Sequence, residues 1–290
     1  MPYNFTHALV GLTALNQTSQ PVRIVASRRR DAFLIGTMGP DPYFGDSRPK
    51  PLFSACREPL AENMHALDAR VLFASMFRLS AENETLEAYT LGFLCHFLLD
   101  SIAHPYIEAR FPGKAHSPAE IQFDLMMTDR TQSPGVPAPP KRFYRTKRIR
   151  ELDTLHAKLC AALFDIQTAG DFARSFRKWI LINTLSYDPD NRKLRFFGAL
   201  ERLLHKPGVL TGLLVAHHPD PNDRLNAKHD EWRAPWEPQT PRTESFPDLF
   251  DDACRKAPAL LDAALHAMRT NDMSEALRLI GPRRMDARPL

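Results

Sequence analysis

The chain has 290 residues, of which 43% are hydrophobic and 25% charged, the usual composition of a globular protein. Its formal net charge of +4 is too small to indicate nucleic acid or membrane binding by itself. No run of about 18 apolar residues is present, so we expect no transmembrane segment. The first residues lack the features of a signal peptide and the four cysteines are widely spaced, which favours a cytoplasmic protein with reduced thiols.

Helical periodicity recurs along the whole chain, and no strand-like alternation persists. We therefore predict an all-α fold, a single-domain multi-helix bundle over residues 1–290. Residues 128–150 are expected to form a proline-rich and then basic surface connection, and residues 219–245 an ordered loop or lid. The C-terminal helices and this covering loop would lie within residues 151–290. Helices are predicted at residues 4–17, 22–38, 59–79, 84–108, from Ser117 onward, and at 149–165, 171–186, 192–205, 208–217, 246–269 and 273–280.

One segment combines apolar residues with a regular row of polar ones. His96, Asp100 and His104 are each four residues apart within the predicted helix 84–108, so they share one helix face. The residues around them are apolar on nearly every side, which is typical of a buried helix. Burying an aspartate between two histidines is costly unless a metal ion compensates the charge. A metal site is therefore predicted, and the alternative is a core histidine pair hydrogen-bonded to the aspartate.

A second row with the same spacing follows: His116, Glu120 and Asp124. Glu120 also fits a capping box that begins at Ser117, and the two roles compete for one carboxylate. Asp124 is either a third ligand or a partner that orients a histidine. These residues, with those of the first row, indicate a metal cluster held between central helices, with the metal-ligand core within residues 1–125.

The order of these residues along the chain resembles that of the zinc-dependent phospholipase C family, relatives of the S1/P1-type nucleases. The shorter bacterial members without a signal peptide resemble this chain also at GPDPYF, residues 39–44, and at DRLNAKHDEWRAPW, residues 223–236. The resemblance covers roughly residues 1–125 and implies a helical bundle that holds zinc ions in a cleft. The residues that follow the family order are His7, Asp41, His65, His96, Asp100, His104, His116 and Glu120.

The resemblance also implies how the ligands are shared among two or three zinc ions. Asp41, His65, His96 and Asp100 would hold the first ion, and His104, His116 and Glu120 the second. His7 would help to hold a third ion, with Asp100 bridging it to the first. Secreted members complete the third site with a processed N-terminal tryptophan, and we hypothesise that Pro2 replaces it here after removal of Met1. The alternative is that His7 is structural or binds alone.

The implied activity is zinc-dependent hydrolysis of phosphate esters, as in a phospholipase C-like phosphodiesterase. Asp41 is the candidate catalytic residue that orients or deprotonates the attacking water. A phospholipid head group is the expected substrate, and a nucleotide or nucleic acid, as for an S1/P1-like nuclease, is possible but not favoured. A third hypothesis is a non-catalytic helical binding protein in which the metal only stabilises the fold.

The sequence allows two interpretations for each of two further segments. Six of the ten residues Lys141–Arg150 are basic, which fits either a solvated helix start or peripheral contact with an anionic membrane surface. In the later loop, His229 is a possible additional ligand, although an exposed loop is the alternative. The same holds for its neighbours His217, His218, Asp220 and Asp223.

Overall fold

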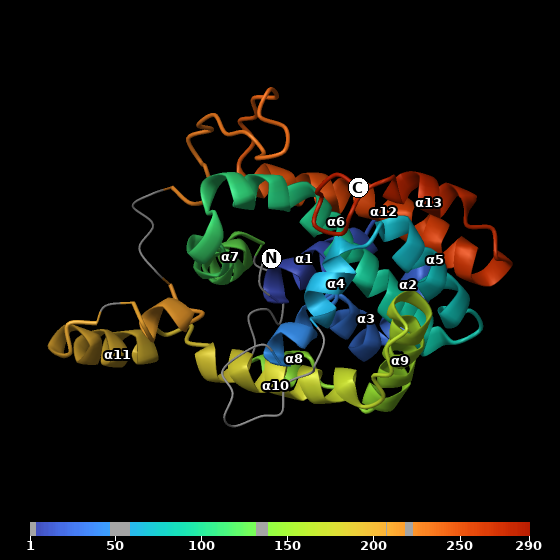
Figure 1. The fold of residues 1–290 in the computed structure, drawn as a ribbon, viewed down its shortest axis with the longest axis horizontal. Helices are drawn as coiled ribbons and strands as arrows, with labels where there is room; N and C mark the ends of the chain where they lie inside the picture. Colours follow the sequence, from blue (N-terminus) through green and yellow to red (C-terminus); the bar gives the residue numbers. More distant parts are fainter. Residues whose placement is uncertain (1–3, 47–58, 132–138, 207, 218–222) are drawn as a thin grey trace.

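A computed structural model describes residues 4–46, 59–131, 139–206, 208–217 and 223–290. Within these ranges the chain forms thirteen α-helices, three short 3-10 helices and no strand, which confirms the predicted all-α fold (Figure 1). The α-helices are α1 Asn4–Leu15, α2 Gln20–Arg28, α3 Arg30–Gly36, α4 Leu60–Ala66, α5 Ala69–Ser80, α6 Glu84–Arg110, α7 His116–Thr131, α8 Pro140–Phe143, α9 Ile149–Phe164, α10 Asp171–Ser186, α11 Arg192–Leu203, α12 Phe246–Thr270 and α13 Ser274–Ile280. The 3-10 helices are η1 Asp41–Asp46, η2 Gly113–Ala115 and η3 Thr211–Leu213.

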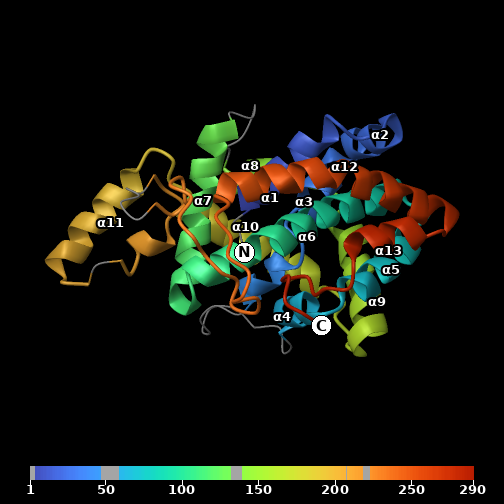
Figure 2. The same ribbon diagram turned by 90° about the horizontal axis from the view of Figure 1, so that it is seen from above.

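The centre of the fold is α6, which packs against α1, α3, α5 and α12 (Figures 1 and 2). Asn83 caps its N-terminus, where the side chain accepts hydrogen bonds from the backbone N–H groups of Thr85 at 3.0 Å and Leu86 at 3.1 Å. Glu87 of α6 is paired with Arg269 of α12 at 3.0 Å. By length and composition α6 could cross a membrane, but 94% of its apolar window is buried inside the molecule. Its apolar character is thus that of a core helix.

Two glycines allow α3 and α6 to cross with their backbones in contact. A Cβ atom on Gly92 would lie 2.0 Å from the carbonyl oxygen of Phe33, and one on Gly36 would lie 2.1 Å from the carbonyl oxygen of Tyr89. No larger residue fits at either position without separating the helices. Because only residues 37–40 separate α3 from η1, this crossing also holds η1 close to α6.

Two helices predicted as continuous are each divided in two. The expected helix 22–38 is broken at Arg29, whose φ of −120° and ψ of 43° are not helical, and it becomes α2 and α3. The expected helix 59–79 is broken at Leu67, which is extended with ψ 153°. Asp68 then starts α5 by accepting a hydrogen bond from the backbone N–H of Arg70 at 2.9 Å. Neither break contains the proline or glycine that would have marked it in the sequence.

The predicted helix 208–217 is wrong, since η3 is the helical turn that the structure has there. The carboxylate of Glu201 on α11 instead accepts hydrogen bonds from the backbone N–H groups of Gly208 and Thr211, both at 3.0 Å. These bonds fix residues 208–213, which we call the strap, to α11. The expected surface connection 128–150 is also partly structured. Helix α7 continues to Thr131, α8 forms at Pro140–Phe143, and Tyr144 is buried; residues 132–138 lie outside the described part of the chain.

Candidate metal centre

The row of polar residues on α6 lies at the heart of the molecule. His96 and Asp100 are completely buried, and His104 is 5% exposed. The Nε2 atom of His96 lies 3.1 Å from Oδ2 of Asp100, its neighbour one turn along the helix. Because α6 is apolar on its other faces, this row is the polar interior of the bundle.

Other elements bring further ligand-type atoms to the same place. Asp41 of η1 and His65 of α4 face each other, with Oδ1 and Nε2 separated by 3.8 Å. The Nε2 of His65 is also 3.7 Å from Oδ2 of Asp100, and that of His96 is 3.8 Å from Oδ1 of Asp41. Four side chains from three elements thus converge on one small volume.

Asp100 joins this first group to a second, which consists of His7, His96 and Asp100 itself. Its other oxygen, Oδ1, lies 3.4 Å from Nε2 of His7 on α1, while Oδ2 faces His65 and His96. The rings of His7 and His96 are stacked, with centroids 4.1 Å apart. The two oxygens of one buried carboxylate therefore point into two adjacent groups of histidines.

A third group lies one turn further along α6, between α6 and α7. The Nε2 of His116 is 2.8 Å from Oε1 of Glu120, and that of His104 is 4.0 Å from the same oxygen. Helix α7 begins at His116, so both of its residues lie in the first two turns and face α6. The side chain of His116 is 20% exposed, the highest value among the eight residues that follow the family order.

The residues fit a set of metal ions by donor chemistry and by spacing. Three groups, His7–His96–Asp100, Asp41–His65–His96 and His104–His116–Glu120, each have their ligand atoms within 4.8 Å of one another. Imidazole nitrogen and carboxylate oxygen are ligands of zinc, and bonds of about 2.0–2.1 Å place two ligands of a tetrahedral ion roughly 3.3 Å apart. The separations of 3.1–3.8 Å among the ligand atoms of Asp41, His65, His96 and Asp100 are close to that value.

Several of these buried atoms have no hydrogen-bond partner among the described residues. They include Nε2 of His7, His65, His96 and His104, Oδ1 of Asp41, and both carboxylate oxygens of Asp100. Buried polar atoms normally have a partner, because an unsatisfied one destabilises the fold. A concentration of such atoms at one place is the pattern expected of a site that binds metal ions.

Neighbouring groups hold these side chains in the protonation states that bind a metal ion. The Nδ1 of His65 donates to the carbonyl oxygen of Ala61 at 2.6 Å, which leaves Nε2 without the proton and directed toward the group. Burial, with a smaller contribution from the neighbouring His96, lowers the pKa of His7 well below its ordinary value. Burial alone would raise the pKa of Asp100, but His96, His104 and His7 outweigh it and hold the pKa well below its usual range. Neutral imidazoles and an ionised carboxylate are the forms that bind zinc.

Gly39 makes room for His96. Its φ is +54°, and a Cβ atom there would lie 2.3 Å from Cδ2 of the His96 ring. Replacing Gly39 with alanine is expected to displace that ring, to lower the zinc content, and to lower the free energy of unfolding by about 3 kcal/mol. Metal analysis and urea unfolding measure both effects.

Gly170→Ala is the matched control for the Gly39 variant. Gly170 also has a positive φ, +84°, but nothing lies within 4 Å of the added Cβ. It should cost only the backbone strain, about 1 kcal/mol, and leave the zinc content unchanged. Equal zinc contents and equal stabilities in the two variants would contradict the proposed contact with His96.

A buried network outside the ligand groups fixes η1, and the sequence analysis missed it. Nδ1 of His156 on α9 lies 3.1 Å from the hydroxyl of Tyr43, and its Nε2 lies 2.6 Å from the hydroxyl of Tyr89 on α6. The ring is also stacked on Phe172 at 3.9 Å. Tyr43 is two residues from Asp41, so the network holds the Asp41 loop against α6. No local pattern around His156 marks this role.

His156 should make the stability of the fold depend on pH. Burial lowers the pKa of His156 to about 3 in the folded protein. In the unfolded chain the same histidine is protonated near its ordinary pKa of about 6.5. The contribution of His156 is therefore complete above that value and is lost as the pH falls toward the folded pKa. Between about pH 7 and about pH 5 the loss should be about 2 kcal/mol.

His156→Gln removes this titration while the other histidines remain. Urea unfolding of the variant and the native protein at both pH values measures the difference directly. The native protein should lose about 2 kcal/mol more than the variant over this interval. An identical loss in both proteins would show that His156 is not held neutral by its surroundings.

Asp124 occupies a different place from the one expected. Its carboxylate accepts hydrogen bonds from the backbone N–H groups of Phe5 at 3.1 Å and Thr6 at 2.9 Å, and from the hydroxyl of Thr6 at 2.8 Å. It is thus neither in a ligand group nor bonded to a histidine, because the first turn of α1 uses both of its oxygens. The effect on the site is indirect: Asp124 ties the start of α1, which carries His7, to α7.

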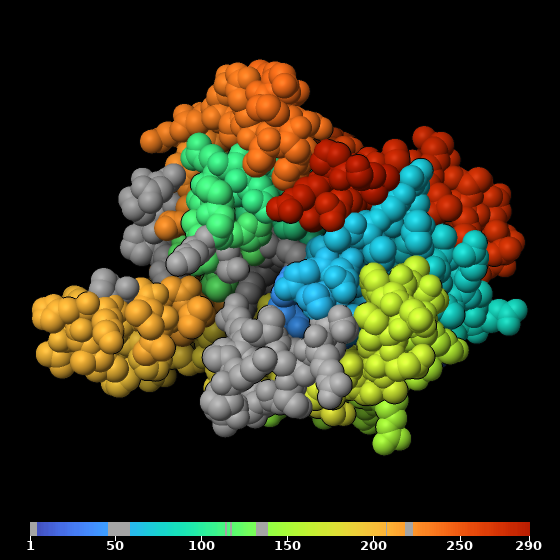
Figure 3. Space-filling view, in the orientation of Figure 1, coloured from blue at the N-terminus to red at the C-terminus, as the bar shows by residue number. Residues whose placement is uncertain are grey.

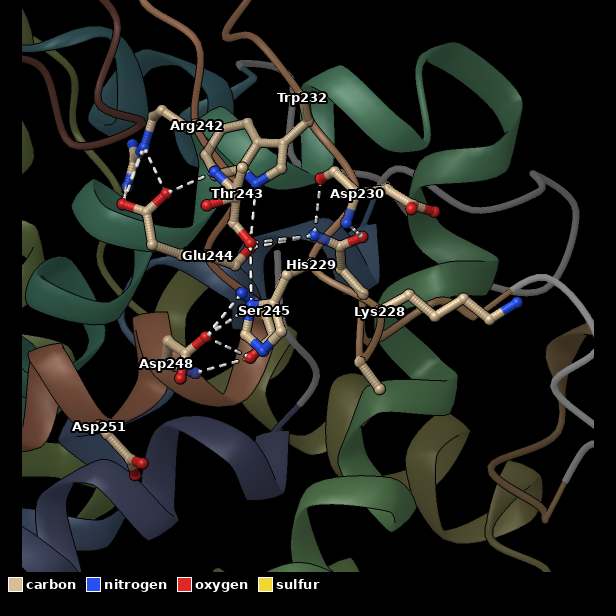
Figure 4. A network of polar contacts seen from close by, with 12 residues as sticks. Lys228, His229, Asp230, Trp232, Arg242, Thr243, Glu244, Ser245, Asp248 and Asp251 are labelled. Atoms are coloured by element: carbon tan, nitrogen blue, oxygen red, sulfur yellow. Dashed lines mark hydrogen bonds and ion pairs between the residues drawn. The ribbon is translucent and has the colours of Figure 1, made fainter.

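The described residues of the late loop do not supply ligands to these groups. Figure 4 shows His229 near the start of α12, where its Nδ1 donates to the carbonyl oxygen of Thr243 at 3.1 Å. The nearby Asp223 accepts backbone hydrogen bonds from Ala227 at 2.8 Å and Lys228 at 3.0 Å, and His217 is paired with Asp129 of α7 at 3.3 Å. The candidates Pro2, His218 and Asp220 lie outside the described residues.

Trp232 of the same loop packs against the central helix. The centroid of its ring lies 5.3 Å from that of Tyr106, two residues beyond His104 on α6, and the guanidinium carbon of Arg242 lies over the Trp232 ring at 4.4 Å from its centroid. Its indole N–H donates to the carbonyl oxygen of Glu244 at 2.9 Å (Figure 4). The part of this loop around Trp232 therefore covers the C-terminal end of α6.

Comparison with known families gives one result. The model of a family described as zinc dependent phospholipase C matches residues 4–168. This stretch contains all eight residues of the three groups and also His156. No curated protein and no solved structure matches the chain.

Proposed function

The chain belongs to the zinc-dependent phospholipase C family, and from this membership and the three buried ligand groups we propose that it hydrolyses phosphate esters, with a phospholipid as substrate. The observation that carries the proposal is the position of Asp100. One of its oxygens faces the His7 group and the other faces the Asp41–His65–His96 group, as expected of a carboxylate that bridges two metal ions.

We assign the ligands in accordance with this geometry. Asp41, His65, His96 and Asp100 would hold one zinc ion, and His104, His116 and Glu120 a second. His7 and Asp100 would contribute to a third, for which Pro2 remains a candidate ligand. When bound, such ions polarise a phosphoryl oxygen, lower the pKa of a bound water and stabilise the leaving oxygen.

The protein's own residues would determine where the substrate enters and how it is oriented. His116 is the most exposed of the eight residues, so the phosphate group would enter at the His104–His116–Glu120 side. Asp41 is the proposed catalytic residue, because its loop carries a carboxylate into the group at a position fixed by Tyr43 and His156. Burial raises the pKa of Asp41 well above its ordinary value while no ion lies beside it, so zinc binding at this carboxylate would release a proton.

A substrate panel tests this function. The purified protein is supplied with a short-chain phosphatidylcholine below its micelle concentration, a dinucleotide and a nucleoside monophosphate. We expect diacylglycerol and phosphocholine from the first and little turnover of the others. Faster cleavage of the dinucleotide would favour a nuclease, and an intact fold with bound zinc but no turnover of any substrate would favour a binding protein.

We also propose peripheral contact with an anionic membrane surface through Lys141–Arg150. Lys141, Arg142 and Arg145 are exposed, as such contact requires. Arg148 contributes less, because it is paired with Asp31 at 3.1 Å. The family's phospholipid substrate supports this contact, and the cations would attract anionic head groups.

A further inference from the structure

Large exposed apolar side chains are concentrated in one part of the molecule. Of the twelve found among the described residues, nine lie between residues 181 and 213, on α10, α11 and the strap that follows. Phe196 is 67% exposed and Leu203 is 76% exposed. Isolated exposed apolar residues are common, but such a concentration marks an interaction surface. The nine are Leu181, Leu185, Phe196, Leu200, Leu203, Leu204, Val209, Leu210 and Leu213.

Helix α11 presents these residues as an apolar ridge bordered by cations. Phe196, Leu200 and Leu203 follow one another at intervals of four and three residues, so they line one face. Arg195 and Arg202, seven residues apart, run along one side of this ridge and are exposed. Both views show α11 at the edge of the molecule, away from the central helices (Figures 1 and 2), and it stands out from the surface in Figure 3.

The strap after α11 is fixed to the helix. Besides the two backbone N–H groups already described, the carboxylate of Glu201 accepts a hydrogen bond from the hydroxyl of Thr211 at 2.7 Å. Val209, Leu210 and Leu213 are therefore held beside α11. The helix and strap together form one hairpin, described over residues 192–206 and 208–213 and called the hairpin 192–213. Because Glu201 faces inward, its negative charge is removed from the exposed face.

The charge of this hairpin is strongly positive. Residues 192–213 contain five basic residues and one acidic one, a net charge of +4, equal to that of the whole chain. The basic segment Lys141–Arg150 begins beside the exposed apolar residues of α10, since the backbone N–H of Lys141 donates to the hydroxyl of Thr184 on α10 at 3.2 Å. Thr184 is flanked in sequence by the exposed Leu185 and lies three residues from Leu181. Apolar and basic groups thus occur together, as in helices that lie in a membrane interface.

We propose that the hairpin 192–213 docks the protein on an anionic phospholipid surface, with Phe196, Leu200 and Leu203 inserted among the lipid chains and the arginines at the head groups. The choice of a lipid as the partner rests on the proposed function, because a phospholipid substrate resides in such a surface. The hairpin lies outside residues 4–168, which the family model matches, so it is not part of the shared metal-binding core.

Vesicle binding tests the proposal. The full chain is incubated with vesicles of equal parts phosphatidylcholine and phosphatidylserine, and the bound fraction is measured by flotation. The double variant Phe196→Asp, Leu203→Asp should bind at least about tenfold more weakly than the native chain. It removes the apolar surface that would be buried in the bilayer and adds negative charges that anionic lipids repel. Val71→Asp on α5, which is 49% exposed, is the matched control and should bind like the native chain.

Three outcomes would overturn the proposal: no vesicle binding by the native chain, equal binding by the double variant, or a native dimer that the double variant converts to monomers. The last would identify a second copy of the chain as the partner. Hydrolysis of short-chain phosphatidylcholine below its micelle concentration is measured in parallel and should not change in the double variant. If that activity is absent while vesicle binding depends on the hairpin, the proposed function fails and the docking surface stands.

Discussion

Asp100→Asn is expected to lower the zinc content by at least one ion per chain and to reduce phosphoester hydrolysis by about a hundredfold or more. Asparagine keeps the shape of the side chain but removes the charge and one of its two acceptor oxygens. Both oxygens of Asp100 face histidine nitrogens, at 3.1 Å for His96 and 3.4 Å for His7. The variant would therefore place an amide where two groups of ligands share a carboxylate.

The control is Asp190→Asn, the same chemical change at an exposed position. Zinc is measured by elemental analysis of protein purified without chelator, and hydrolysis is measured with short-chain phosphatidylcholine. Circular dichroism shows whether each variant is folded. A folded Asp100→Asn protein with full zinc content and full activity would remove Asp100 from the metal centre.

Gly92→Ala is expected to lower the free energy of unfolding by roughly 3 kcal/mol, because the added methyl group meets backbone and not a side chain that can move aside. The new Cβ would lie 2.0 Å from the carbonyl oxygen of Phe33, so α3 and α6 must separate. Since η1 and Asp41 follow α3, zinc binding should weaken as well. Urea unfolding gives the free energy, and metal analysis gives the occupancy.

Gly198→Ala provides the comparison within another helix. Gly198 lies inside α11, and the nearest atom to its added Cβ is 3.8 Å away, at ordinary contact distance. Alanine there should raise the free energy of unfolding by up to about 1 kcal/mol, because glycine is the poorer helix former. If the two variants had similar stabilities, the close crossing of α3 and α6 would be wrong.

The sequence predicted the all-α fold and the buried row on α6, because both depend on local spacing. A four-residue interval places His96, Asp100 and His104 on one face whatever surrounds the helix. The approach of His7, Asp41 and His65 to that row could not be derived from spacing. It depends on how four separate elements pack, and only the family resemblance indicated it.

What the sequence did not predict depends on contacts between distant segments. Asp124 has the spacing of a ligand, but the N-terminus of α1 packs beside it and uses its carboxylate. His156 has no motif around it, and its partners Tyr43 and Tyr89 come from two other elements. The helix breaks at Arg29 and Leu67 have no proline or glycine to mark them. The exposed ridge of α11 was also beyond prediction, since periodicity shows an apolar face but not whether another helix covers it.

The most direct test of the proposed function is to measure zinc and phospholipid hydrolysis together in the same purified protein. We predict at least two zinc ions per chain in protein never exposed to a chelator, with release of phosphocholine from short-chain phosphatidylcholine. Chelation should abolish the release, and added zinc should restore it, because seven ligands for two ions lie within the described residues. Fewer than one tightly bound zinc ion per chain, or hydrolysis that continues unchanged after the metal is removed, would contradict this function.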